Sequence, residues 1–505
     1  MISPITVIIP VVAKVSQATL PFGSCLKISS RIASDILSQI SGKGKRFAPE
    51  ISAGREKEDL RNTKNELGNY ISIIAFKSCY NLTGISIPDN VKSICWRAFS
   101  DCSSLTSVTM SDSVTRIDDE AFSNCSSLTS VAISNNLTDV GVGVFDGCFS
   151  LQYNEYDNAY YLGNSNNPYF LLVMVNDANI TSVNIHSNTK IIYSWAVSGC
   201  TRLTNITIPD GVRSIGLGAF QECTSLTSII LPDSITSISQ QMLWGCTSLI
   251  SITIPDSITS ICHGAFHGCT SITSIEIPDS VTSIGSYAFR DCSGLTSIVI
   301  PNRVTFIGYS AFEGCTKLTS VTIPNSVTEI EEKVFDSCPS LQYNEYDNAY
   351  YLGNNNNPYL LLVKAKDTNI TSINIHSNTR IIHSAAFEEC DSLTSVTIPD
   401  SVTNIGYRAF YSCDFLASVT IGNSVTRICN SAFEYCMSLT SVTIPNSVTS
   451  IGDRAFYLCS RLTSVTIPDR ITSIGYGSFY NCSLTSIVIP DGVTSIGLCA
   501  FEGCP

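Results

Sequence analysis

The sequence predicts a repeat solenoid: a curved, β-rich stack of coils with short helical or 3₁₀ turns on its outer side and two inserted β-hairpins. Three observations predict it. A 23-residue block recurs from Leu82 onward, one cysteine recurs in each block, and two longer segments interrupt the series. A unit this short cannot enclose a core alone, whereas stacked units bury a continuous core between neighbours. We therefore expect a solenoid over residues 70–505, preceded by a lead-in over residues 1–69.

The cysteines define the register of the repeat. Within each group they are 23 residues apart, except for a final step of 22, and two gaps of 52 residues separate the groups. A Phe stands three residues before each of them, except where Val197 and Leu243 take its place. Both positions are interpreted as pointing inward. The template cysteines are Cys79, Cys102, Cys125, Cys148, Cys200, Cys223, Cys246, Cys269, Cys292, Cys315, Cys338, Cys390, Cys413, Cys436, Cys459, Cys482 and Cys504.

The template LTSVTIPDSVTSIGxxAFxxCxS predicts the path of one coil. Leu393, Val396 and Ile398 show the apolar positions of a half-buried strand. Pro399 follows and ends this strand, because proline has no N–H to donate to a ladder. A second short alternation follows in SVTSIG, and the AFxxC stretch is predicted to form one helical or 3₁₀ turn.

Residues 149–199 and 339–389 are two copies of one insert, identical at 37 of 51 positions. In each copy, two extended stretches flank an Asn-rich turn that contains Pro, which predicts a β-hairpin projecting from the solenoid. Its tyrosines are candidate partner-binding residues, because aromatic side chains are favoured anchors at protein interfaces. The alternative is that they cover the edge of the solenoid. These candidates are Tyr153, Tyr156, Tyr160, Tyr161, Tyr343, Tyr346, Tyr350 and Tyr351.

The lead-in over residues 1–69 differs in character from the repeats. Isoleucines at helical spacing over residues 29–40 predict a short amphipathic helix that caps the stack, and residues 41–66 are interpreted as a polar linker. The apolar start over residues 1–13 lacks a basic segment and contains two prolines, so it is a poor match to a signal peptide. No apolar run reaches the roughly 18 residues that a transmembrane helix needs.

The formal net charge of −13 limits the partners of the repeats. An acidic surface repels phosphate groups, so nucleic acids and anionic membranes are not expected to bind. The chain stops within the template at residues 501–505, which leaves self-association through an uncapped C-terminal end as an expectation.

The sequence offers few groups for catalysis or metal binding. Cys262, His263, His267 and Cys269 lie close enough in sequence to suggest a zinc site, but Cys269 is a template residue pointing inward, so we expect the ligands to diverge and no metal to bind. No nucleophile with its partners and no phosphate-binding loop is found, so we expect neither an enzyme nor a cofactor. The template cysteines are expected to form a buried, reduced ladder, with oxidation as the alternative in a secreted protein.

Variation within the template indicates where recognition would occur. The two strand positions that flank the central apolar residue are almost uniformly Ser and Thr. In contrast, the two positions before Ala-Phe and the two after it vary, as in Trp96–Arg97, Tyr407–Arg408 and Tyr457–Leu458. This outer edge and the hairpins are therefore better candidates than the sheet. The alternative is that exposed loop positions vary without any function.

The pattern from Leu439 to Phe456, LTSVTIPNSVTSIGDRAF, resembles the BspA-like subclass of leucine-rich repeats. The resemblance covers roughly residues 70–505 and implies a leucine-rich-repeat horseshoe. It also implies a microbial surface or secreted protein that adheres to host proteins or aggregates cells, with a protein or cell-surface ligand as partner. A cytoplasmic location is the alternative, since no convincing signal peptide is present. Two other functions remain open: a purely structural surface coat, and a repeat region that presents substrates to an enzyme domain.

Overall fold

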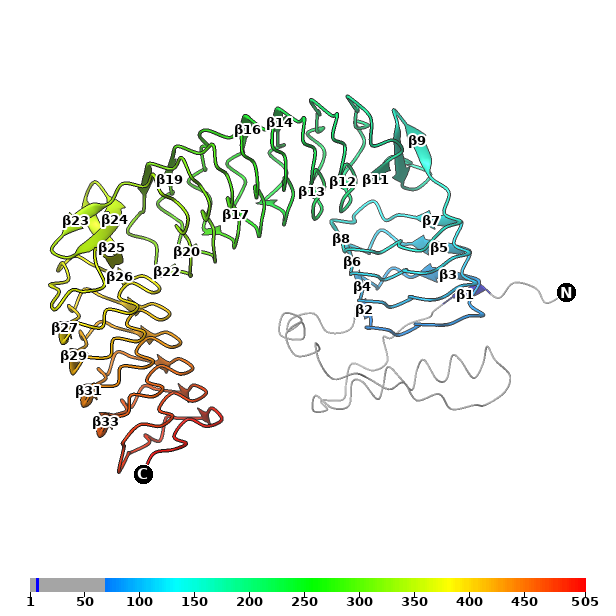
Figure 1. The fold of residues 1–505 in the computed structure, drawn as a ribbon. Helices are drawn as coiled ribbons and strands as arrows, with labels where there is room; N and C mark the ends of the chain where they lie inside the picture. Colours follow the sequence, from blue (N-terminus) through cyan, green and yellow to red (C-terminus); the bar gives the residue numbers. More distant parts are fainter. Residues whose placement is uncertain (1–5, 9–68) are drawn as a thin grey trace, which may run out of the picture. The chain divides into compact units, whose positions relative to one another are not determined.

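The computed structural model describes residues 6–8 and 69–505; the predicted helix over residues 29–40 and the linker over residues 41–66 lie outside these ranges. The chain divides into two compact units. One comprises Met1–Cys223 with Pro232–Ile235, and the other comprises Thr224–Leu231 with Thr236–Pro505. In both units the described chain winds into stacked coils (Figure 1). The described part of the chain contains no helix with the length and apolar character needed to cross a membrane.

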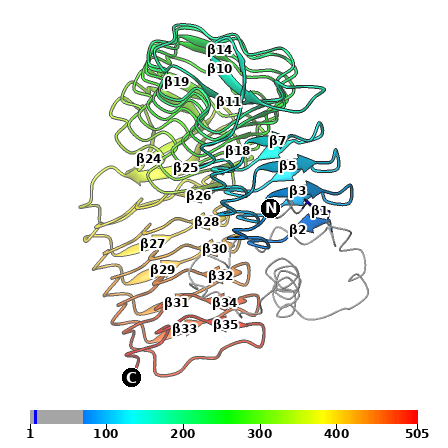
Figure 2. The same ribbon diagram turned by 90° about the vertical axis from the view of Figure 1, so that its right-hand side faces the viewer.

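Within each unit, a regular coil contributes up to two short strands, and strands at the same position of neighbouring coils pair in parallel over parts of a first and a second row. In the second unit, Figure 2 shows β27, β29, β31 and β33 in the first row and β30, β32 and β34 in the second. The first row comprises β3 (Gly84–Ile87), β5 (Ser107–Met110), β7 (Ser130–Ala132), β14 (Ser228–Ile230), β16 (Ser251–Thr253), β19 (Ser297–Val299), β21 (Ser320–Thr322), β27 (Ser395–Thr397), β29 (Ser418–Thr420), β31 (Ser441–Thr443) and β33 (Ser464–Thr466). The second row comprises β2 (Tyr70–Ile71), β4 (Ser93–Ile94), β6 (Arg116–Ile117), β8 (Asp139–Val140), β12 (Ile191–Ile192), β13 (Ser214–Ile215), β15 (Ser237–Ile238), β17 (Ser260–Ile261), β18 (Ser283–Ile284), β20 (Phe306–Ile307), β22 (Glu329–Ile330), β26 (Ile381–Ile382), β28 (Asn404–Ile405), β30 (Arg427–Ile428), β32 (Ser450–Ile451), β34 (Ser473–Ile474) and β35 (Ser495–Ile496). A further strand, β1 (Thr6–Ile8), pairs in parallel with β3.

The strand register follows from the repeat, because a shift of one residue would turn every apolar side chain to the other face. Ser395 of β27 pairs with Ser418 of β29, the residue 23 positions later. In each strand the residue after this serine is an inward-facing valine, and the first of them, Val396, is only 3% exposed. Threonine side chains reinforce the stack: Thr319 donates its hydroxyl hydrogen to the carbonyl oxygen of Thr296 at 2.9 Å. Some of the repeated threonines thus form a ladder of side-chain hydrogen bonds between neighbouring coils.

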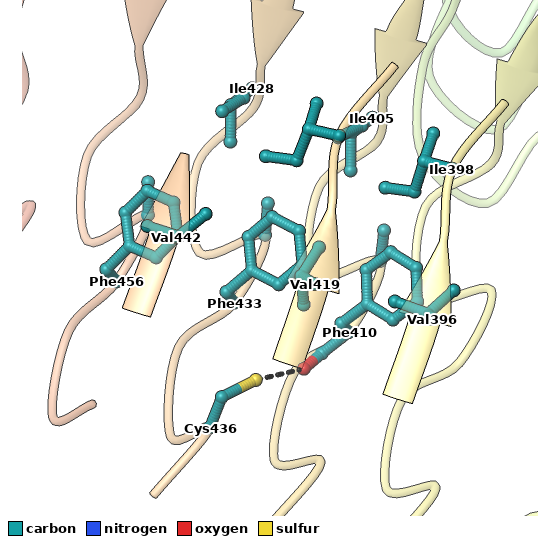
Figure 3. Close-up of a cluster of buried hydrophobic side chains, with 14 of the residues drawn as sticks. Val396, Ile398, Ile405, Phe410, Val419, Ile428, Phe433, Cys436, Val442 and Phe456 are labelled. Atoms are coloured by element: carbon teal, nitrogen blue, oxygen red, sulfur yellow. Dashed lines mark hydrogen bonds between the residues drawn. The ribbon is translucent and has the colours of Figure 1, made fainter. Parts of the chain in front are cut away.

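The template Phe and Cys residues form the core beside the turns. The rings of Phe410 and Phe433 are stacked with their centroids 5.1 Å apart, and Phe456 continues the stack at 5.3 Å (Figure 3). The thiol of Cys436 donates a hydrogen bond to the carbonyl oxygen of Phe410 at 3.1 Å. Both inward assignments are confirmed, since Phe433 and Cys436 are fully buried.

The AFxxC stretch departs from the prediction, because no α- or 3₁₀-helix occurs in residues 69–505. It is a series of tight turns in which alternate residues bond in different directions. Ala409 donates its N–H to Gly406 within the coil at 3.2 Å, whereas Phe410 donates to Ala432 of the next coil at 2.8 Å. This alternation requires left-handed backbone two residues before and two residues after each Phe, as at Arg408 (φ 52°) and Ser412 (φ 56°). Positive φ values at these intervals are incompatible with a right-handed helix.

Each insert contains three antiparallel strands: β9 (Asn154–Tyr156), β10 (Ala159–Leu162) and β11 (Leu171–Val175) in the first, and β23 (Asn344–Tyr346), β24 (Ala349–Asn354) and β25 (Asn357–Ala365) in the second. The predicted hairpins are therefore present, as β10–β11 and β24–β25.

The hairpins do not project from the stack as expected. In the second copy β24 pairs with β21 of the first row, and β25 pairs with β26 of the second row. The hairpin thus takes the place of a regular coil and joins the two rows into one sheet. Gly353 allows the tight connection, because a Cβ atom there would clash with the carbonyl oxygen of Asn357.

Candidate interaction surface

Two of the eight candidate tyrosines belong to the core. Tyr161 and Tyr351 are both 0% exposed, and each hydroxyl accepts a hydrogen bond from a backbone N–H, that of His186 at 3.3 Å and that of His376 at 3.4 Å. Burial raises the pKa of Tyr351 to about 12. These two side chains cannot meet a partner without unfolding the insert, because the hairpin is packed into the stack.

A first pair of rings lies partly exposed on each insert sheet. Tyr153 and Tyr160 have ring centroids 5.5 Å apart, and the corresponding Tyr343 and Tyr350 are 5.3 Å apart. We call each pair a tyrosine pair. In both copies the rings pack against each other at an intermediate tilt, which fixes their orientation before any partner arrives.

The second tyrosine pair carries cations that the first lacks. The ammonium group of Lys364 lies 5.6 Å from the ring centroid of Tyr343, and that of Lys366 lies 5.8 Å from that of Tyr350. Lys366 also forms an ion pair with Glu345 at 2.8 Å. A cavity of about 440 Å³ opens here and is lined by both tyrosines, Glu345 and Lys364. In the first copy, Met174 and Asn176 occupy the positions of the two lysines.

A second aromatic cluster involves residues that the sequence reasoning did not select. Tyr169 stacks on His186 with ring centroids 4.0 Å apart, and Tyr156 meets the same imidazole edge-on at 4.8 Å. Tyr359 and His376 repeat the stack in the second copy at 4.1 Å. Both residue types are the same in the two inserts, and this was the sequence signal that could have identified them. In this cluster Tyr156 is 41% exposed, so part of it faces solvent.

The varied template positions form an aromatic belt, which we define as Tyr411, Tyr435, Tyr457 and Tyr480 of the second unit. Successive ring centroids lie 5.4, 6.1 and 4.7 Å apart. The guanidinium of Arg408 lies 3.9 Å from the ring centroid of Tyr411. From Tyr411 to Tyr480, the edge indicated by sequence variation is therefore a continuous row of packed tyrosine rings built on turns.

The four residues considered for zinc have separate partners. His267 stacks on Trp244 with ring centroids 4.4 Å apart, and burial lowers the pKa of its imidazole. His263 packs edge-on against Tyr287, while Cys269 donates its thiol hydrogen to the carbonyl of Leu243 at 3.2 Å. Among the residues that the structure describes, no group of three or more His, Cys, Asp or Glu side chains is arranged to hold a metal ion.

A buried template thiol such as Cys292 is a poor nucleophile in this setting. Burial raises the pKa of Cys292 to about 12, and its thiol donates to the carbonyl oxygen of Phe266 at 3.1 Å. Because the thiolate is the reactive form, a thiol held protonated at neutral pH is inert. The described cysteines are free thiols, and most of the template thiols are buried.

The stacked strands, phenylalanine core and repeated turns define a leucine-rich-repeat scaffold. The family model described as "BspA type Leucine rich repeat region (6 copies)" matches residues 64–166, 174–296, 243–356, 365–477 and 426–505. The chain belongs to this family. Members of this class are repeat proteins that generally function without catalysis.

Solved structures include similar chains. A leucine-rich repeat protein from Bacteroides ovatus is 26% identical, with 84% of this chain and 83% of that chain covered and a TM-score of 0.28. A leucine rich cell surface protein from Faecalibacterium prausnitzii is 27% identical, with 84% and 91% covered and a TM-score of 0.26. The pneumococcal vaccine antigen PcpA is 15% identical, with 82% and 84% covered and a TM-score of 0.26. No curated protein matches the chain.

Proposed function

We propose that this chain is a non-enzymatic protein-binding scaffold acting in adhesion at the cell surface, and that the tyrosine pairs of the two inserts contact the partner. The observation that carries the proposal is the duplication of these pairs. Tyr153 with Tyr160 and Tyr343 with Tyr350 keep nearly the same ring separation, 5.5 and 5.3 Å, and each pair stays partly exposed.

The support for each pair suits protein recognition. Binding is weakened by the cost of ordering side chains, and rings that are already packed on a rigid sheet avoid most of that cost. Tyrosine is among the residues that most often dominate the binding energy of an interface. Two equivalent sites on one chain also permit a multivalent partner to gain avidity without any new contact.

Capture from an extract of surface proteins tests the proposal. The wild type is compared with a variant carrying Tyr153→Ala, Tyr160→Ala, Tyr343→Ala and Tyr350→Ala, which leaves the buried Tyr161 and Tyr351 in place. The control is Phe415→Ala, which removes a 63% exposed ring outside the inserts. Any captured protein is identified, purified and bound again, and thermal unfolding confirms that each variant is folded.

The fourfold variant is expected to bind the purified partner at least about tenfold more weakly, because loss of an aromatic hot spot costs about 2 kcal/mol or more. The control is expected to bind like the wild type. Equal binding by the fourfold variant would contradict the assignment to the tyrosine pairs and favour the aromatic belt. Absence of any captured partner would favour a purely structural stack.

A further inference from the structure

The insert coils interrupt a regular bond between neighbouring coils. In regular coils, the first apolar residue of the SVTSIG segment has a carbonyl oxygen that accepts a hydrogen bond. The donor is the serine that begins the same segment in the next coil. Ser326 donates its hydroxyl hydrogen to Val304 at 2.7 Å, and Ser447 donates to Val425 at 2.6 Å. The coils just before the inserts end this series at Leu137 and Val327, because a hairpin rather than a regular coil follows each.

An arginine replaces the missing bond in the first copy. The guanidinium of Arg213 donates to the carbonyl oxygen of Asn135 at 3.0 Å and to that of Leu137 at 2.6 Å. Its central carbon lies 5.5 Å from the ring centroid of Phe170. A planar group with several N–H donors thus satisfies two carbonyls together, as guanidinium geometry allows.

The second copy keeps the acceptors and lacks the arginine. The positions 190 residues later hold Asn325 and Val327, whereas Thr403 stands in place of Arg213. The Thr403 hydroxyl donates to the carbonyl of Arg380 at 3.2 Å. Among residues 69–505, no donor bonds to the carbonyl oxygen of Asn325 or Val327.

A cavity lies at this position. Its volume is about 440 Å³, and its lining includes Asn325, Arg380, Asp400, Ser401 and Thr403. The hydroxyl oxygen of Ser401 is buried and has no hydrogen-bond partner among the described residues. Of the two unused carbonyl acceptors, that of the exposed residue Asn325 belongs to this lining. The buried Ser401 hydroxyl lines the same cavity without a partner, which is costly for a buried polar group.

The second copy carries one cation fewer than the first at these positions. In the first copy Lys190, Asp210 and Arg213 occupy the corresponding positions, two cations with one anion. In the second copy Arg380 and Asp400 remain, one cation with one anion. The Asp400 carboxylate accepts the N–H of Asn423 at 2.7 Å, and no ion pair neutralises it within the described chain.

We propose that this cavity binds one guanidinium group from outside the chain, the arginine side chain of a partner protein, in the place that Arg213 holds in the first copy. The arginine as source rests on the proposed function, whereas binding of the guanidinium group does not. The first copy thus shows the occupied form of the site that is open in the second.

Titration calorimetry with Nα-acetyl-arginine amide tests the site directly. The wild type is expected to bind one equivalent, and Thr403→Arg, which supplies the guanidinium from within, is expected to bind at least tenfold more weakly. Arg213→Thr opens the first copy and is expected to bind two equivalents. Nα-acetyl-lysine amide and Nα-acetyl-citrulline amide are the matched probes, and both are expected to bind at least tenfold more weakly than the arginine probe.

Absence of saturable binding to the wild type would overturn the proposal, as would equal binding to Thr403→Arg or equal binding of the lysine probe. If Arg213→Thr fails to fold, the wild type and Thr403→Arg still decide the question. The source is tested by partner capture: Thr403→Arg with undiminished capture would overturn the arginine assignment. The tyrosine variants are unaffected by these results, so failure here is distinguishable from failure of the proposed function.

Discussion

The two insert coils are the same structure with different chemistry. Their strands occupy equivalent positions, and Tyr161 and Tyr351 are equally buried. The residues that differ include Tyr193 against His383 and Gly199 against Glu389. The comparison teaches that packing determines the core of the hairpin. Around this core, the same fold accepts residues that differ in their protonation, charge and backbone strain.

The largest expected effect concerns the shared core. Tyr351→Ala is expected to lower the free energy of unfolding of the second unit by about 3–5 kcal/mol, because it removes a fully buried ring. Its neighbour Tyr350 is partly exposed, so Tyr350→Ala is expected to cost less than half as much. Urea unfolding followed by circular dichroism measures both. Equal losses would show that the face of the hairpin is wrongly assigned.

A second effect sharpens the difference between Tyr193 and His383. The Tyr193 hydroxyl accepts the N–H of Val144 at 2.7 Å, whereas Nε2 of His383 donates to the carbonyl of Glu331 at 3.2 Å. Burial lowers the pKa of His383 from 6.5 to about 4. The unfolded chain therefore takes up this proton first, and stability falls as the pH drops from about 6.5 to about 4, by about 3 kcal/mol in total.

His383→Tyr, which installs the residue of the first copy, is expected to remove this acid-dependent loss. Urea unfolding at a series of pH values, with wild type and variant side by side, isolates the histidine because other titrating groups contribute to both. An unchanged pH dependence in the variant would refute the assignment. Tyr193→His is the reciprocal change and is expected to introduce the same loss into the first unit.

The smallest expected effect concerns backbone strain. Glu389 has a φ of 57°, while Gly199 in the first copy has a φ of 73° and an added Cβ there would contact nothing within 4 Å. A left-handed conformation costs a residue with a Cβ about 1–2 kcal/mol. Glu389→Gly is thus expected to raise the stability of the second unit by about 1 kcal/mol, and Gly199→Ala to lower that of the first by a similar amount. Thermal unfolding tests the pair; a loss in Glu389→Gly would mean that the glutamate makes a compensating contact.

The sequence predicted the coil well because its periodicity reports burial directly. The inward positions of Val396 and Phe433 and the register of 23 residues are confirmed. The prediction of a helical turn for the AFxxC stretch was wrong, because residue types such as Arg408 and Ser412 do not indicate a left-handed backbone conformation. Bonds to the next coil impose that conformation, and they exist only after stacking.

The candidate site was predictable in part. The duplicated insert and the preference of interfaces for aromatic residues identified the insert tyrosines, and strand alternation implies that Tyr160 and Tyr161 face opposite ways. Which of the two faces inward depends on how β10 and β11 join the rows, and a register irregularity falls between those two residues. Tyr169 and His186 meet only through this arrangement.

By itself, the sequence determined the repeat, its register, the membership in a leucine-rich-repeat family and the positions of the two inserts, because each is written as a pattern within one or two neighbouring coils. Only the tertiary structure decided which tyrosines stay accessible and that Arg213 fills the gap that Thr403 leaves open. The physical reason is distance along the chain. Arg213 reaches carbonyls 78 and 76 residues away, and no local pattern encodes a contact between coils that a hairpin separates.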